Sequence, residues 1–292
     1  MDRLIFLDDD EYPISVMKNK FGHLVWMGQG VVGNHIKYSN DADITHGYHC
    51  GYISPIPFIQ FNEIITQHDF KTFISAISNE IVTWESVKEN ILQNHGVTFA
   101  DSEIINNGFA SEVKEEFGMK FISGANLCFN LKNCRNRLPP FFNPPDARGE
   151  DTFMSTALSE MKVLRIPVYT FHDGFLQYQR ILRGILPVEL QPVNATSPTV
   201  IKRFIAAAIG WIRYKPLMIY VTKPNDYFSV IEKMREDLWK VLPKFCSFFK
   251  TEKFMQIEEE LEFYHKNVRK HFDSFTARKK AWRKLMDYLM NQ

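Results

Sequence analysis

The chain opens with a short apolar run at residues 4–7 that ends in three consecutive aspartates, Asp8, Asp9 and Asp10. An apolar run bounded by charge is typical of a strand buried on both faces in a sheet that is covered by helices. In open α/β sheets, ligands bind at the carboxyl edge of the strands, where fixed dipoles line a crevice. The run therefore predicts an α/β fold with the aspartates at a ligand-binding edge.

The spacing of the aspartates is compatible with a cation site. Asp8 and Asp10 stand at i and i+2, so their carboxylates can converge on one divalent cation and, through it, on phosphate oxygens. A solvated acidic turn is the alternative. Haloacid-dehalogenase-like phosphatases also carry such a pair, followed by Gly and then Thr or Val, but this chain has Glu11 and Tyr12 at those places.

Composition excludes several classes of protein. Of the 292 residues, 45% are apolar and 24% are charged, which rules out disorder or a coiled coil as the overall description. The formal net charge of +1 gives no field that selects nucleic acid, so no nucleic-acid partner is expected. The four cysteines form no CxxC pair, which argues against structural zinc and a disulfide framework and favours a cytoplasmic setting.

Two features of the first third leave alternatives open. Gly28, Gly30 and Gly33 have the spacing of a dinucleotide-binding loop, but the two valines between them continue a β-like run, so a turn or bulge is predicted. A cluster of aromatic and imidazole side chains can line an acceptor pocket, or simply pack a loop. Its members are His46, Tyr48, His49 and Tyr52. Apolar spacing over 68–95 predicts two helices above the sheet.

The second third supplies further polar candidates. Gly124 and Ala125 interrupt two apolar runs and would let a ligand approach the backbone, while Asn126 offers both a donor and an acceptor. A β-bulge is the alternative. Glu150 and Asp151 fall in the first turn of a predicted helix, where the helix dipole favours ionised carboxylates and would keep a base deprotonated. Simple dipole compensation would give the same pattern.

A strand pattern over 163–171 ends at His172. A histidine at a strand end can supply an imidazole to the same crevice as the aspartates. A lone histidine is more often structural, but its position after the other motifs favours a functional role.

Taken in order, these motifs resemble the GT-A class of glycosyltransferases, particularly the family-two-like bacterial enzymes. The resemblance covers residues 4 to about 180 and is carried by Leu-Asp-Asp-Asp-Glu-Tyr-Pro at 7–13, Ser-Gly-Ala-Asn at 123–126, Arg-Gly-Glu-Asp-Thr-Phe at 148–153 and Tyr-Thr-Phe-His-Asp-Gly at 169–174. It implies a partial GT-A fold, which is Rossmann-like, with a mixed central sheet flanked by helices. We expect this catalytic portion over 1–195 and an all-helical region over 196–292.

The resemblance also implies roles for single residues. Asp10 would be a metal ligand for Mn²⁺ or Mg²⁺, Asp8 would contact the nucleotide or a metal-bound water, and His172 would complete the metal shell. Asp151 matches the catalytic base of inverting members, with Glu150 beside it. The implied reaction transfers a sugar from a nucleotide-sugar donor, expected to be UDP-linked, to a hydroxyl of a glycan or cell-envelope polysaccharide.

The remaining candidate residues are assigned to the two substrates. Donor contacts would come from Asp8, Asp9, Gly124, Ala125 and Asn126, and acceptor contacts from His46, Tyr48, His49 and Arg148.

GT-A enzymes normally place several βα units, which bind the base and ribose of the donor, before the aspartate motif. This chain begins at that motif, so we expect a truncated or split gene product, or a start codon assigned too late. The alternative function is a catalytically inactive remnant that binds a metal, a glycan or a partner.

The last third is predicted to be helical over 226–242, 252–272 and 275–290, after an uncharged run at 204–212 that is too short to span a bilayer. Residues 263–286 contain eight lysines and arginines against one aspartate. A solvated helix face is the favoured interpretation. With its interleaved aromatics, the stretch could alternatively contact an anionic membrane from a peripheral position at the inner face, or bind a polyanionic acceptor.

Overall fold

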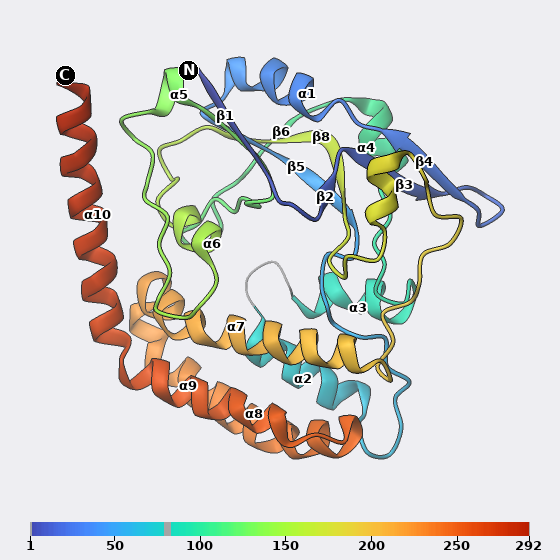
Figure 1. Ribbon diagram of the computed structural model, residues 1–292. Helices are drawn as coiled ribbons and strands as arrows, with labels where there is room; N and C mark the ends of the chain where they lie inside the picture. The colour runs from blue at the N-terminus through green and yellow to red at the C-terminus, as the bar shows by residue number, and fades with distance from the viewer. Residues whose placement is uncertain (1, 79–82, 292) are drawn as a thin grey trace.

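The computed structural model describes residues 2–78 and 83–291, and within them a mixed sheet lies above a layer of helices (Figure 1). The order of strands is β1–β7–β5–β8–β2, with β6 also paired to β8. These strands are β1 (Arg3–Leu7), β2 (Glu11–Tyr12), β5 (Ile44–Gly51), β6 (Ser111–Glu112), β7 (Asn126–Asn130) and β8 (Val163–His172). The expected α/β class with a mixed sheet flanked by helices is confirmed.

The directions of the strands decide where the polar motifs meet. β7 is antiparallel to both β1 and β5, and β5 is parallel to β8. The carboxyl ends of β1, β5 and β8 therefore share one edge of the sheet with the amino end of β7. This edge receives the aspartates that follow β1, the turn before Asn126, and His172 at the end of β8.

The first strand differs from its predicted environment. Among the described strands β1 pairs only with β7, so it stands at one end of the sheet. Residues 3–6 are half-buried and Leu7 is 40% exposed. The prediction of a strand buried on both faces is therefore wrong for this structure, because an end strand lacks a neighbour on one side.

A buried polar network fastens β7 to β5. The Asn126 amide donates to the carbonyl of Tyr48 at 3.2 Å, and its oxygen lies 2.8 Å from Nε2 of His35. The other ring nitrogen of His35 lies 2.7 Å from the Thr45 hydroxyl. Burial lowers the pKa of His35, so the neutral ring can donate to Asn126 and accept from Thr45.

The helical layer has a continuous aromatic core. It contains α2 (Gln67–Ile77), α3 (Trp84–Leu92), α7 (Pro198–Thr222), α8 (Tyr227–Phe249) and α9 (Gln256–Lys266). Phe73 stacks on Phe245 with ring centroids 4.0 Å apart, and Phe204 packs against both Phe73 and Phe254. The predicted helices within 68–95 are confirmed in the described residues. The division at residue 195 stays a prediction, although α2 and α3 share the core of the later helices.

Helix α7 is long and apolar enough, by length and composition, to cross a membrane. It packs against α9, α8 and α2, and 61% of its most apolar window is buried inside the protein. It therefore serves as the central helix of the lower layer, which agrees with the first of the two alternatives for the run at 204–212, a core helix or an interfacial helix.

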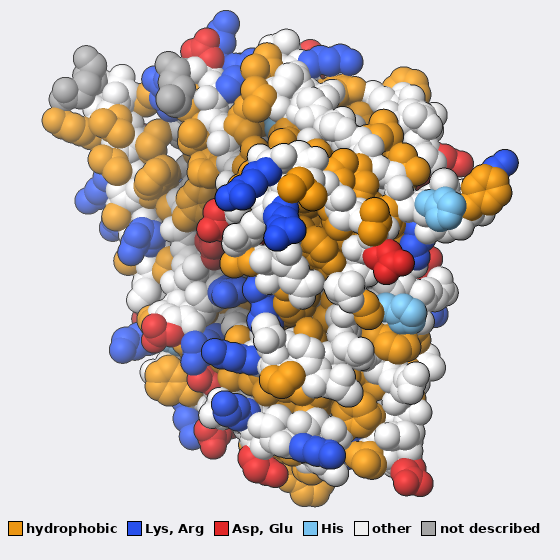
Figure 2. Space-filling model, turned by 45° about the vertical axis from the view of Figure 1, so that its right-hand side comes forward, with side chains coloured by type: hydrophobic (Ala, Val, Ile, Leu, Met, Phe, Trp, Pro, Cys, Tyr) orange, Lys and Arg blue, Asp and Glu red, His pale blue; other side chains and the backbone are white. Residues whose placement is uncertain are grey.

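The last helix, α10 (Val268–Met290), runs up the side of the molecule beside the sheet (Figure 1). Phe275 is buried and the Trp282 ring donates to the carbonyl of Leu138 at 2.7 Å, so these aromatics pack inward. Hydrophobic side chains gather instead near the end of the chain, at the upper left of Figure 2. They include Leu285, Tyr288, Leu289 and Met290. Membrane contact by this helix stays a prediction.

Three local predictions are corrected. The glycine-rich stretch after β4 (Leu24–Gly28) opens a helix, α1 (Val31–Tyr38), rather than a bulge. Because β4 pairs with β3 (Ile14–Lys18) in a separate two-stranded sheet, this helix does not complete a βαβ unit. The apolar pattern predicts a strand that begins at Phe121, but residues 121–123 form none. It also predicts a helix from Glu150 that reaches Met161, whereas α6 (Glu150–Ser155) ends earlier. The other short helices are α4 (Ser102–Asn107) and α5 (Leu131–Cys134).

Gly47 is a strict requirement of the sheet. A Cβ at this position would lie 2.6 Å from the carbonyl oxygen of Val168 and would overlap the Asn126 amide.

We expect Gly47→Ala to lower the free energy of unfolding by about 2 kcal/mol or more, through overpacking, in urea denaturation. Gly33→Ala is the control, because nothing lies within 4 Å and an alanine favours helix α1 by about 1 kcal/mol. Equal stability of the two variants would contradict the requirement at Gly47.

Candidate functional site

The acidic run after β1 meets the end of β8. Asp10 Oδ2 lies 3.3 Å from His172 Nε2, and the backbone N–H of Asp173 donates to the carbonyl of Asp10 at 2.8 Å. The hydrogen bond from His172 outweighs burial and lowers the pKa of Asp10. Burial alone would lower the pKa of His172, but Asp10 and Glu11 raise it overall. The structure thus joins two residues that were predicted to share a site.

Asp8 lies in a crowded acidic environment. Burial, followed by the charges of Glu11 and Asp10, raises the pKa of the Asp8 carboxyl. A divalent cation would relieve this repulsion. The described residues contain no ready group of three or more His, Cys, Asp or Glu side chains that could hold a metal. Asp10 and His172 could supply two ligands of a cation, and phosphate oxygens and water would have to fill its remaining positions.

A second chain of contacts leads from the acidic run to the turn before β7. The buried Glu11 carboxylate lies 2.8 Å from Nδ1 of His49, and Nε2 of His49 lies 2.7 Å from the Ser123 hydroxyl. In the neutral tautomer with the proton on Nδ1, the Nε2 atom of His49 accepts a hydrogen bond from the Ser123 hydroxyl. Glu11 and Ser123 were not predicted as site residues, although each lies within one of the motifs that carry the resemblance.

Asp151 lies at the start of α6, beside the same turn. Its carboxylate accepts from the backbone N–H of Thr152 at 2.8 Å and from that of Gly124 at 3.4 Å. Burial, together with the charge of Glu150, outweighs these hydrogen bonds and raises the pKa of Asp151. The direction is opposite to the one expected from the helix dipole alone. A raised pKa brings a general base closer to neutral pH.

Glu150 behaves in the opposite way. Its carboxylate accepts from the Asn143 amide at 2.8 Å and from the backbone N–H of Gly149 at 3.1 Å. Burial raises the pKa of Glu150, but these hydrogen bonds prevail and the net shift is downward. The adjacent carboxyls are therefore tuned apart, as in sites where one group must exchange a proton and the other must stay ionised.

The start of α6 rests on the helical layer. Gly149 has a φ of +115°, and a Cβ there would lie 3.0 Å from the ring of Tyr214 on α7. Phe153, one turn into α6, packs against Phe275 of α10 with ring centroids 5.5 Å apart. Both contacts fix the direction of α6 and hence the position of Asp151.

A cavity of about 580 Å³ opens between this site and α3. Three predicted residues line it: His46, His49 and Asp151. Ser123 and Arg165 also line it, and neither was predicted. The predicted base and two predicted acceptor contacts thus line one shared cavity, which is large enough for a small saccharide.

The other predicted residues lie elsewhere. Asn126 is fully buried, and its amide is committed to the network between β5 and β7. Tyr48 stacks on Tyr169, and the guanidinium of Arg165 on β8 lies over the Tyr48 ring. Arg148 is exposed, and its side chain lies near Gly210 of α7. Gly124 and Ala125 form the half-buried turn before β7, and Asp9 is exposed.

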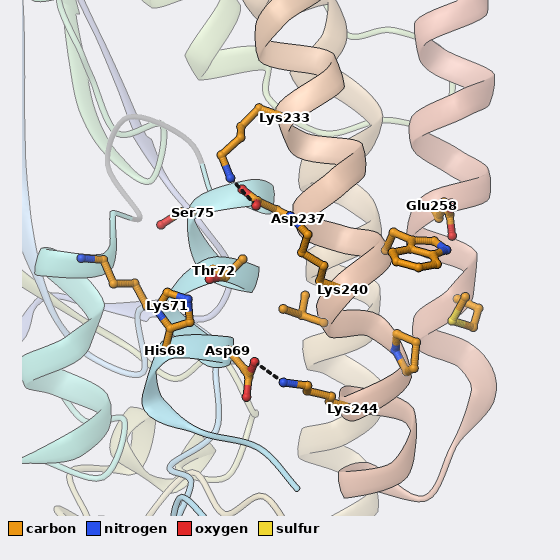
Figure 3. Close-up of a pocket in the computed structure, with 14 residues that line it drawn as sticks. His68, Asp69, Lys71, Thr72, Ser75, Lys233, Asp237, Lys240, Lys244 and Glu258 are labelled. Carbon is orange, nitrogen blue, oxygen red and sulfur yellow. Dashed lines mark hydrogen bonds and ion pairs between the residues drawn. The ribbon is translucent and has the colours of Figure 1, made fainter.

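A larger groove of about 1100 Å³ lies between α2 and α8 (Figure 3). Among the described residues lining it, none belongs to the predicted site. Its charges are largely paired: Asp69 binds Lys244 at 2.6 Å, and Asp237 binds Lys233 on the same helix. These pairs satisfy one another, so the groove offers no comparable chemistry.

Comparison with known protein-family models, with curated proteins and with solved structures found no match for this chain.

The opposite shifts at Asp151 and Glu150 predict opposite effects on stability. The pKa of Asp151 is higher in the folded protein than its ordinary value of 3.8, so ionising this carboxyl costs stability. The free energy of unfolding falls as the pH rises from 3.8 to beyond the folded pKa. We therefore expect Asp151→Asn to be more stable than the wild type at pH 7, with the difference vanishing below pH 3.8.

Glu150→Gln is the matched control. The lowered pKa of Glu150 contributes stability above the ordinary value of 4.5, which is lost as the pH falls through the folded pKa, so this variant should be less stable at pH 7. Urea denaturation between pH 3 and pH 7 measures both. Destabilisation by Asp151→Asn at pH 7 would show that its hydrogen bonds outweigh its burial.

Proposed function

We propose that this chain is a metal-dependent glycosyltransferase of the GT-A class that inverts configuration at the transferred sugar. The observation that carries the proposal is the meeting of four separate motifs at one sheet edge. The aspartates after β1, the Ser-Gly-Ala turn, the start of α6 and His172 are distant in sequence. Direct contacts nevertheless join Asp10 to His172, and Gly124 to Asp151.

In this proposal Asp151 is the general base. Its carboxylate removes the proton of an acceptor hydroxyl as that oxygen forms a bond to the anomeric carbon of the donor. The bond from the anomeric carbon to the diphosphate oxygen breaks, and its electron pair leaves with the nucleoside diphosphate. A bound Mn²⁺ or Mg²⁺ would neutralise the departing diphosphate, and Asp10 and His172, with Asp8 nearby, would hold it.

The positions of these residues also support attack by an acceptor bound in the cavity on a donor bound at the sheet edge. Asp151 lies on the cavity wall, whereas the Asp10–His172 pair lies at the sheet edge outside the described lining. An acceptor in the cavity would therefore meet a donor held over the edge. The competing proposal, an inactive protein that binds only a metal or a glycan, predicts binding without turnover.

The test combines cation binding with turnover. We expect Mn²⁺, followed by electron paramagnetic resonance, to bind the wild type and Asp151→Asn, and to bind Asp10→Asn and His172→Ala much more weakly. With a panel of nucleotide sugars and oligosaccharide acceptors, Asp151→Asn should lower the rate of nucleoside diphosphate release by about 10²- to 10⁴-fold.

Asp237→Asn is the control, because Asp237 lies in the groove between α2 and α8. It should leave Mn²⁺ binding and turnover unchanged. Turnover by Asp151→Asn at the wild-type rate would remove Asp151 as the base. Absence of turnover across the panel, with Mn²⁺ still bound, would favour the inactive binding protein.

The relay of Glu11, His49 and Ser123 favours a second candidate function, hydrolysis of an ester. A buried carboxylate, an imidazole and a serine hydroxyl stand in the order that activates a serine nucleophile. However, the backbone N–H of Gly124, next to that serine, already binds the Asp151 carboxylate. A negative group there would oppose an oxyanion, so transfer of a sugar is the better supported function.

A fluorophosphonate probe tests this second function, because it reacts covalently with activated serines. The hydrolase proposal expects labelling of Ser123, located by mass spectrometry, and its loss in His49→Ala. Ser54→Ala should retain the label, because Ser54 lines the cavity outside the relay. An unlabelled wild type would reject the hydrolase.

A further inference from the structure

The wall of the cavity contains an unusual buried histidine. His46 on β5 is 4% exposed, and neither of its ring nitrogens has a hydrogen-bond partner within the described part of the chain. Burial, aided by the nearby Arg165 charge, lowers the pKa of His46 to about 3, so the ring is neutral. A neutral imidazole offers one N–H donor and one acceptor, and buried polar atoms of this kind are normally satisfied.

Arg165 lies opposite His46 in the register of β5 and β8. Its guanidinium carbon stands 3.8 Å from the centroid of the Tyr48 ring, which in turn stacks on Tyr169 at 5.1 Å. The Tyr48 ring supports the guanidinium of this exposed arginine, and Tyr169 packs behind that ring. Over residues 2–78 and 83–291, no carboxylate and no hydrogen-bond acceptor pairs with it. Its five N–H donors therefore remain available to a ligand in the cavity.

One cavity wall contains both His46 and Asp151. His46 and His49 are separated by three positions on β5, which corresponds to at most about 10 Å of strand. His49 contacts Ser123, whose neighbour Gly124 binds Asp151. A disaccharide can therefore place one ring beside Asp151 and the next ring over His46 and Arg165.

The cavity contains charges of both signs. Asp151 and Glu116 line it, and so do Lys114 and Arg165. The cavity as a whole is thus not strongly cationic. Arg165 is the cation that lies opposite His46, and its guanidinium lacks a carboxylate partner in the described structure.

We propose that His46 and Arg165 form a subsite for a carboxylate or phosphate that the acceptor glycan carries on the unit next to the one that reacts. This inference rests on the proposed transferase function and specifies its acceptor class, an acidic saccharide. The planar fork of Arg165 binds two oxygens of the anion, and the neutral His46 ring donates a third hydrogen bond. Tyr48 supports the guanidinium from behind and is a positioning residue.

Direct binding to the full chain tests the subsite without any need for turnover. The probes are cellobiouronic acid, which carries its carboxylate on the second ring, and cellobiose, its neutral counterpart. Calorimetric titration should give at least about tenfold tighter binding of the acidic disaccharide, the scale of one charge-assisted hydrogen bond. A second comparison uses glucose 1-phosphate and its neutral counterpart, glucose, to test a phosphate. Tighter binding of either anionic probe than of its neutral counterpart supports the subsite.

Two variants locate the preference. Arg165→Gln should bind acidic and neutral disaccharides equally, and Arg183→Gln, an exposed arginine outside the cavity, should keep the wild-type ratio. In nuclear magnetic resonance spectra of ¹⁵N-histidine-labelled protein, the acidic ligand should shift the His46 ring signals in the wild type and not in Arg165→Gln. If Arg165→Gln does not fold, His46→Gln should weaken the acidic preference by a similar factor.

The possible failures can be told apart. Equal affinity for cellobiouronic acid and cellobiose in the wild type, together with no anion preference in the phosphate arm, would overturn the subsite while leaving the transferase proposal standing. An acidic preference that persists in Arg165→Gln would overturn the assignment to Arg165. Loss of sugar transfer is measured separately, by release of nucleoside diphosphate.

Discussion

The reversed direction of β7 is the constraint on which the site depends. Because β7 runs antiparallel between β1 and β5, its first residue lies at the edge where both neighbours end. The buried Asn126 amide fastens that residue to β5, and the absence of a side chain at Gly47 gives the amide its space. The polar turn at 123–125 is thereby held between the aspartates and α6. A site built from four separate segments follows from one strand direction.

Burial sets the electrostatics of this edge more than formal charge does. Asp151 and Glu150 are neighbours with the same chemistry, yet burial raises the pKa of one and hydrogen bonds lower that of the other. At His172, burial would lower the pKa, but the hydrogen bond and charge of Asp10 outweigh it, so the pKa is raised. The edge thus combines a proton acceptor, an ionised carboxylate and an imidazole without a large net charge in the chain.

Elements defined by local periodicity could be predicted from the sequence. The strand ending at His172 and the helices with aromatic residues at helical spacing were expected and are present. Features set by distant contacts could not be predicted. No local pattern shows that β1 stands at the end of the sheet, that Asn126 bridges two strands, or that Arg165 remains without an acidic partner in the described structure. Helix α1 was missed because valines favour strands and three glycines weaken a helix signal.

The contact between Gly149 and Tyr214 has a consequence for how such a chain can diverge. An aromatic ring from α7 occupies the space that a side chain at 149 would need, so the backbone before Asp151 and the helical layer are matched in shape. A side chain at 149 would therefore need a smaller residue at 214, so the two positions constrain each other. Exchanging the helical layer for another would remove this match and shift the start of α6, which contains Asp151.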